Sequence, residues 1–173
     1  MTPPSGKLKL TMPGDCEIAF TRDFVAPRKL VFAAFTKPAM VKRWLLGPDG
    51  WTMPVCKMDL RVGGSYRWVW RHRDGREMGM GGVYREVTPP ARIVFTEQFD
   101  QPWYSGAALI TVEFHEQDGK TTLTQTIRYE SKAVRDTVLK SGMRSGVKTS
   151  YDRLEKILAS PVAKTRAKRV RRK

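Results

Sequence analysis

The sequence has 173 residues, 40% of them hydrophobic, and a formal net charge of +15. This length and apolar content fit a single globular domain with a sizeable core. No apolar run approaches the roughly 20 residues that a membrane-spanning helix needs, and the start, MTPPSGKLKL, lacks the apolar core of a secretory signal. These features exclude a protein with transmembrane helices, and we expect a cytoplasmic one.

Much of the positive charge lies at the C-terminal end. Seven of the 32 basic residues follow Ser160, with no acidic residue among them, which leaves 25 basic and 17 acidic residues in the rest of the chain. Because residues 160–173 also have little apolar content, we predict a disordered basic tail. Such a tail is either a solubilising terminus or a site of weak, salt-dependent contact with nucleic acid or an anionic surface.

Metal and disulfide chemistry have little support in the sequence. The two cysteines, Cys16 and Cys56, form no CxxC pattern, so they predict neither a disulfide framework nor a cysteine-based zinc site. His72 and His115 lie beside two different predicted hairpin turns and do not make a metal site together. We expect no metal and no cofactor.

The chain opens with two predicted short strands, over residues 7–12 and 16–24, and two short helices follow them. Pro27 suits the first position of the first helix, Pro38 opens the second, and Gly47 closes it. The order of elements is therefore strands, two small helices, and then a longer region of different pattern.

That longer region, residues 51–130, predicts about six antiparallel strands. Apolar and polar residues alternate along it, and the Asp-Gly pairs at 74–75 and 118–119 are strong hairpin signals. A short helical lead-in follows Ser131. This pattern is typical of a meandering antiparallel sheet.

The last predicted element is a long amphipathic helix over residues 142–159. Since a single helix cannot bury an apolar face alone, the strands must supply a matching surface. Gly146, inside this helix, costs about 1 kcal/mol relative to alanine, which predicts close backbone packing or a local bend beside the cavity, with a merely tolerated glycine as the alternative. Spacings of three and four place the apolar residues on one face: Met143, Val147, Tyr151, Leu154 and Leu158.

The alternation of the strands indicates which side chains face this helix. Tyr66, Trp68 and Trp70 share one face of their strand. A curved sheet with large side chains on its concave face, closed by one helix, either packs solid or encloses a cavity. The same parity groups Met78 with Met80, Phe95 with Glu97 and Phe99, and Leu123 with Gln125.

Four stretches of the chain together resemble a known family: FTRDFVAPRKLVFAAFTKPAMVKRWLLGPDGW, DLRVGGSYRW, GGVYREVTPPARIVFTEQF and RDTVLKSGMRSGVKTSYDRLEKILA. They are similar to bacterial proteins of the START-like (SRPBCC) superfamily, and within it to homologues of the activator of the heat-shock-protein ATPase. The resemblance implies an α+β helix-grip fold, in which a curved antiparallel sheet wraps around a long C-terminal helix. It also implies a cavity between them that often receives apolar small molecules. We therefore divide the chain into an N-terminal extension (1–14), a START-like helix-grip domain (15–159) and the basic tail (160–173).

Candidate ligand-binding residues follow from combining this fold with strand parity. Aromatic and methionine side chains offer adaptable apolar surface, although each has an ordinary core role as its alternative. Trp44, on the second short helix, either guards the cavity mouth or caps the sheet edge. The candidate set is Trp44, Tyr66, Trp68, Trp70, Met78, Met80, Glu97, Phe99, Gln125, Met143, Val147 and Tyr151.

Glu97 is the main polar candidate in this set. A carboxylate between Phe95 and Phe99 either shifts toward its neutral form or needs a partner, and the alternatives are a structural salt bridge or exposure at a strand end. The sequence has no GxSxG, GxxxxGK[ST] or HExxH motif. Glu97 is therefore also the single, weak candidate for a catalytic acid or base.

Three functions stay open at this point. The favoured one is binding of a small, mainly apolar molecule in the cavity. A stress-related co-chaperone acting on a heat-shock-protein ATPase is implied by the family resemblance alone. The third is a polyketide-cyclase-like or hydrolase-like enzyme, because some relatives in the superfamily shape a bound substrate for such reactions.

Overall fold

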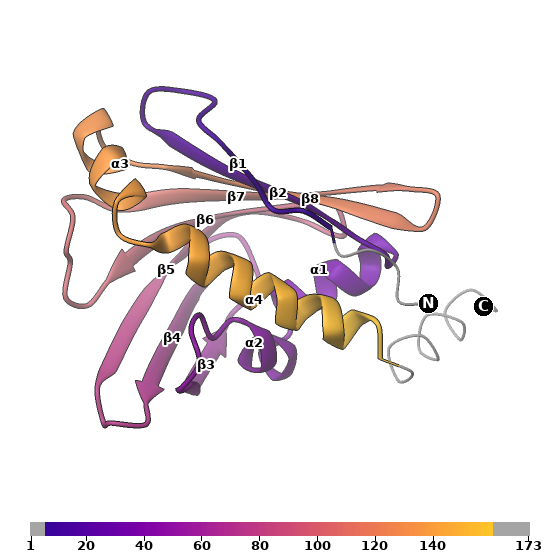
Figure 1. Cartoon of the computed structure of the whole chain (residues 1–173), viewed down its shortest axis with the longest axis horizontal. Helices are drawn as coiled ribbons and strands as arrows, with labels where there is room; N and C mark the ends of the chain where they lie inside the picture. The colour runs from indigo at the N-terminus through magenta and orange to yellow at the C-terminus, as the bar shows by residue number, and fades with distance from the viewer. Residues whose placement is uncertain (1–5, 161–173) are drawn as a thin grey trace.

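A computed structural model describes residues 6–160, which form an α+β helix-grip fold (Figure 1). Eight antiparallel strands make one curved sheet in the order β1-β2-β8-β7-β6-β5-β4-β3. The long helix α4 lies in the concavity of this sheet (Figure 1), so the predicted fold class is confirmed. The strands are β1 Lys9–Thr11, β2 Glu17–Phe24, β3 Trp51–Met58, β4 Ser65–His72, β5 Glu77–Thr88, β6 Arg92–Phe99, β7 Ala108–Gln117 and β8 Lys120–Arg128.

Local turn chemistry explains how neighbouring strands connect. Asp118 and Gly119 join β7 to β8, and their φ angles of 54° and 75° are both positive. Two such residues make a type I′ turn, whose twist matches that of an antiparallel pair. The predicted hairpin at this Asp-Gly pair is thereby confirmed.

Irregular pairing bends the sheet. The register shifts between Thr52 and Val55 in β3, where Pro54 lies, and between Tyr84 and Glu86 in β5. An extra residue on one strand increases local twist and curvature. These shifts help β3, β4 and β5 to curve away from the flatter part of the sheet (Figure 1).

The N-terminal extension contributes a strand to this sheet. β1 pairs with β2 through Lys9 and Thr21, Leu10 and Phe20, and Thr11 and Ala19. Leu8, just before it, is buried in the core. The predicted first strand is confirmed, and residues 8–11 are part of the same folded unit as the domain that follows.

The helices begin at local sequence signals. Pro27 precedes the first helix instead of occupying its first position, whereas Pro38 is the first residue of the second. Ser131 caps the third helix by accepting a hydrogen bond from the backbone N–H of Val134 at 3.2 Å. Gly142, with a φ of 80°, turns the chain into the fourth. The helices are α1 Arg28–Thr36, α2 Pro38–Trp44, α3 Lys132–Leu139 and α4 Met143–Leu158.

The C-terminal half of α4 covers a fully buried part of the core. Leu154 has no exposed surface, and Tyr151 is 2% exposed. The ring of Tyr151 lies 5.8 Å from that of Phe24 and 6.0 Å from that of Trp44. β2, α2 and α4 therefore meet around one aromatic cluster.

An ion-pair group attaches the same half of α4 to the sheet. Arg22 of β2 is 1% exposed, and its guanidinium lies 2.6 Å from Asp152 and 3.1 Å from Glu155. If α4 moved along the sheet, Arg22 would lose both carboxylates and its buried charge would be left uncompensated, which is energetically costly. This group fixes where the helix lies on β2.

Candidate ligand-binding cavity

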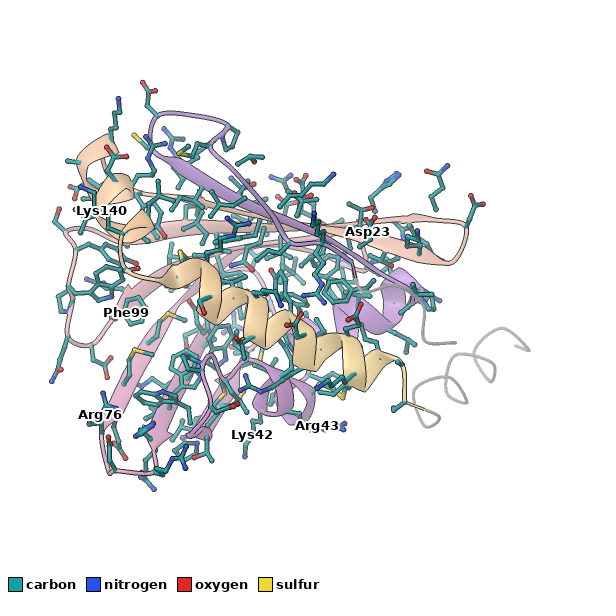
Figure 2. The ribbon with its side chains drawn as sticks, in the orientation of Figure 1. Asp23, Lys42, Arg43, Arg76, Phe99 and Lys140 are labelled. Atoms are coloured by element: carbon teal, nitrogen blue, oxygen red, sulfur yellow. The ribbon has the colours of Figure 1, made fainter. Side chains whose placement is uncertain are left out.

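An apolar cavity lies between the concave face of the sheet and the N-terminal half of α4. Its volume is about 410 Å³, within the roughly 300–1,000 Å³ typical of small-molecule sites. Phe99 of β6 lies near the N-terminal end of α4 (Figure 2). The lining residues are Phe35, Val41, Trp44, Leu45, Leu46, Gly47, Pro48, Trp51, Trp68, Trp70, Met78, Met80, Phe95, Glu97, Phe99, Val112, Gln125, Ile127, Met143, Gly146, Val147, Ser150 and Tyr151.

All but one of the predicted ligand-binding residues line this cavity. Their role in binding stays a prediction, but their positions are those that strand parity and helix spacing indicated. Met78 lines the cavity and is also 41% exposed, so the cavity opens to solvent beside it. The lining members of the predicted set are Trp44, Trp68, Trp70, Met78, Met80, Glu97, Phe99, Gln125, Met143, Val147 and Tyr151.

Tyr66 is the exception, and its prediction as a lining residue is wrong. Its ring packs against Tyr84 and Phe95, with centroids 5.6 and 5.4 Å away, and its hydroxyl donates to the carbonyl of Thr96 at 2.7 Å. Tyr66 therefore fills the sheet's own core. Parity identifies the inward face of β4, but it does not say how far along the strand the cavity extends.

The tryptophans of the cavity wall differ in how their indole N–H groups are used. Trp44 donates to the carbonyl of Ala34 at 2.8 Å and Trp70 to that of Leu45 at 2.7 Å. The indole N–H of Trp68 is buried and has no acceptor within residues 6–160. Trp44 and Trp70 are thus fixed by hydrogen bonds, while Trp68 is held by packing alone.

The segment between α2 and β3 forms a wall that the sequence did not suggest. Leu45, Leu46, Gly47 and Pro48 all line the cavity. The backbone N–H of Gly47 donates to the hydroxyl of Ser150 at 2.9 Å, which attaches this segment to α4. Two adjacent leucines before a Gly-Pro pair were the available signal, because large apolar residues in a loop need a surface to cover.

Arg153 strengthens the same attachment from one turn further along α4. One guanidinium nitrogen donates to the carbonyl of Gly47 at 2.5 Å, and the other lies 2.9 Å from Asp49. Asp49 is 91% exposed, so this ion pair is solvated. Segment 45–49 is therefore fastened to the helix at the edge of the cavity by polar contacts.

Gly146 faces open space. A Cβ atom added at this position would meet nothing within 4 Å, and the residue is part of the cavity lining. The predicted close backbone packing is wrong. The missing side chain instead leaves room between the helix and the sheet.

Glu97 is the single charged side chain among the lining residues of the described chain. Burial raises its pKa to about 7, although a hydrogen bond from the hydroxyl of Tyr104, at 3.4 Å, acts in the opposite direction. No cation lies within ion-pair distance of Glu97 in residues 6–160, so the predicted salt-bridge alternative is not found there. The carboxyl group is placed where it changes charge near neutral pH.

Gln125 and Tyr151 make the other polar contact inside the cavity. The Tyr151 hydroxyl donates to Oε1 of Gln125 at 2.8 Å, so this amide is paired across the sheet and the helix. The hydroxyl of Tyr129 instead lies 3.8 Å from the sulfur of Met143. The cavity therefore combines a large apolar surface with one carboxyl and one amide group.

Other kinds of site have no geometric support in the part of the chain that the structure describes. No three His, Cys, Asp or Glu side chains within it are grouped as metal ligands. None of its helices is both long and apolar enough to cross a membrane. The predicted basic tail, from residue 161 on, lies outside the described residues.

Comparison with known proteins gives a consistent result. The family model described as "Activator of Hsp90 ATPase homolog 1-like protein" matches residues 25–159. No curated protein matches the sequence.

Several solved structures share the fold. The crystal structure of a protein from Rhodobacter sphaeroides has 29% identity and a TM-score of 0.84, and the match covers 88% of this chain and 98% of that one. A protein from Mycobacterium smegmatis has 22% identity and a TM-score of 0.78, with 91% of this chain and 98% of that one covered. An AHSA1-like protein from Aeromonas hydrophila has 18% identity and a TM-score of 0.65, with 83% of this chain and 96% of that one covered.

Proposed function

Because the chain belongs to the family of Activator of Hsp90 ATPase homolog 1-like proteins, we propose that it binds a small, mainly apolar molecule between the sheet and α4. The observation that supports this function best is the cavity of about 410 Å³. Protein interiors normally hold few voids larger than a water molecule. An apolar space of this size, open beside Met78, is what a ligand site requires.

A neutral probe tests this proposal. We expect 2-(hydroxymethyl)naphthalene to bind the full chain. Isothermal titration calorimetry should then record a heat of binding, and the indole N–H signals of Trp68 and Trp70 should shift in NMR spectra. Both rings line the cavity, so they report on its occupation directly.

A matched pair of variants on α4 supplies the control. Gly146→Phe places a ring in the cavity, where an added Cβ meets no atom within 4 Å, and we expect the affinity to fall about tenfold or more. Ser145→Phe adds the same ring at the neighbouring, exposed position and is expected to leave the affinity unchanged. Equal affinities in both variants, once circular dichroism shows that both are folded, would place the probe elsewhere and contradict the proposal.

General acid–base catalysis by Glu97 is a second candidate function. The supporting observation is the position of its carboxyl group in the apolar cavity. Burial there raises the pKa of Glu97 to about 7, and a catalytic acid or base works best when its pKa lies near the working pH. The test is turnover of aromatic polyketide-like precursors by the wild type and by Glu97→Gln. Product formed equally by both would remove Glu97 from any such reaction.

A co-chaperone function has only the family description behind it. The test is the ATPase rate of the corresponding bacterial heat-shock protein with and without this chain. A rate that does not change at saturating concentration would exclude the function for this protein, because sharing a fold does not transfer a partner.

A further inference from the structure

The charge inside the cavity is opposite to that of the protein. The chain carries a net charge of +15, yet the described residues that line the cavity include no Lys, Arg or His, and Glu97 is the one ionisable acid among them. A half-buried carboxylate in a mainly apolar cavity favours a ligand group that brings positive charge or hydrogen-bond donors. The cavity is therefore built to accept a cation and not an anion.

The carboxyl group of Glu97 also has unused capacity. Its one hydrogen bond within residues 6–160 comes from Tyr104 to Oε1, and at 3.4 Å it is long for an O–H donor. Oε2 has no partner among the same residues. An ionised carboxylate accepts several hydrogen bonds, and Oε2 is not among the buried polar atoms that lack a partner in the described residues, so it is accessible to solvent and to a donor from a ligand.

The walls around Glu97 are aromatic. Phe99 follows two residues later on β6, and Trp68, Trp70 and Phe95 form a continuous group with ring centroids 6.1 and 6.4 Å apart. The faces of such rings carry partial negative charge and attract organic cations, most strongly where water is excluded. A carboxylate and several aromatic rings in one cavity are the groups that recognise an ammonium group on an apolar body.

Resting on the proposed function, we propose that the ligand is a lipophilic amine, bound as its ammonium ion. An ammonium N–H donates to the Glu97 carboxylate, and the apolar body occupies the aromatic space beneath the N-terminal half of α4. This assigns a chemical class to the ligand that apolar burial alone leaves open.

The titration of Glu97 makes the affinity for an amine depend on pH. The titratable groups that interact electrostatically with Glu97 are Tyr104, Tyr129, which follows β8, and Tyr66 on β4. Burial raises the pKa of each tyrosine further above its ordinary value near 10. Glu97, whose pKa burial raises to about 7, is then the one group among them that titrates near neutrality. Since an ammonium ion binds the carboxylate form, affinity rises with pH through this range and levels off above it.

Two probes of the same size test the proposal. 2-(Aminomethyl)naphthalene carries the ammonium group, and 2-(hydroxymethyl)naphthalene is its neutral counterpart. At pH 8 we expect the amine to bind the wild type about tenfold or more tightly than the alcohol. Glu97→Gln is expected to remove this preference, so that the variant binds the amine and the alcohol with affinities within about twofold of each other.

A pH series on the wild type needs no variant. Between pH 6 and pH 8 we expect the affinity for the amine to rise about tenfold, following the ionised fraction of Glu97, while that for the alcohol stays level. Equal affinities of both probes, a flat profile for the amine, or preference for 2-naphthoic acid would overturn the amine assignment while leaving apolar binding intact. Failure of every probe to bind would instead contradict the proposed function.

Discussion

The two halves of α4 face the same sheet, but most apolar side chains of one half are fully buried and those of the other are only partly buried. In the C-terminal half Leu154 and Leu158 are 0% and 5% exposed. In the N-terminal half Met143, Gly146 and Val147 form the roof of the cavity. Both halves carry the same apolar spacing. An amphipathic stripe therefore indicates which face of a helix points to the core, but not whether side chains or a cavity lie beneath that face.

The elements opposite each half explain the difference. Phe24, Phe35 and Trp44 bring aromatic rings to within about 6 Å of Tyr151, where the packed half begins. Opposite the other half, β4 and β5 curve away from α4 (Figure 1). The cavity of about 410 Å³ lies on this side of the helix.

The largest expected effect is on the packed half. Leu154→Ala removes a fully buried side chain, and we expect it to lower the free energy of unfolding by about 2–5 kcal/mol. Val147→Ala, two turns earlier and half-buried, is expected to cost roughly 1 kcal/mol or less. Urea denaturation measures both, and similar costs would break the distinction between the two halves.

A pH effect on stability is expected from the cavity half. The pKa of Glu97 is raised from 4.5 to about 7 in the folded protein, so the folded state binds the proton more tightly than the unfolded state does. Stability therefore falls as the pH rises from about 4.5 to about 7, by up to roughly 3 kcal/mol, and changes no further above it.

Glu97→Gln is the control for this pH effect, because the amide does not titrate. The difference in the free energy of unfolding between the wild type and this variant should change across that pH range and nowhere else. A constant difference from pH 4 to pH 8 would mean that folding does not raise the pKa of Glu97.

A smaller effect is expected at the boundary between the two halves. Tyr151→Phe keeps the packed ring but removes the hydrogen bond to Gln125, at a cost of about 1 kcal/mol. Gln125→Leu, which removes the other partner, should make the Tyr151→Phe change smaller in a double-mutant cycle. Additive costs would show that the two groups do not interact.

The smallest expected effect has the opposite sign. Gly146→Ala adds a methyl group in open space and should stabilise the protein by up to about 1 kcal/mol, since alanine is the better helix former. Gly142→Ala is the matched control, because Gly142 has a φ of 80° and alanine there costs about 1–2 kcal/mol. Thermal unfolding distinguishes the two, and a destabilising Gly146→Ala would mean that the cavity roof is packed.

Local signals were sufficient to predict most of the fold. The Asp-Gly pair at 118–119, the proline that opens α2 and the spacing from Met143 to Leu158 each depend on residues close in sequence. Strand parity also identified most of the cavity wall, because the face of a strand is fixed by a period of two. The family resemblance then joined these elements into one architecture.

The features that sequence reasoning missed depend on three-dimensional separation. Nothing near Tyr66 says that the cavity ends before it, and nothing near Gly146 says that the opposite wall is distant. The lining by Leu45 and Leu46 depends on hydrogen bonds that Gly47 makes with α4, more than 100 positions later. These features depend on the distance between elements in space. Neither the periodicity of apolar residues nor secondary-structure propensity predicts that distance.

The edges of the sheet bear on how the protein behaves at high concentration. A sheet that does not close into a barrel has two outer strands, whose unpaired backbone groups can add a strand from another molecule. Here one outer strand, β1, has three residues, and the other, β3, is interrupted at Pro54, which lacks an N–H, and carries the exposed Lys57. Neither edge is a good template for strand addition, which limits the pairing of this open sheet with a strand of another molecule.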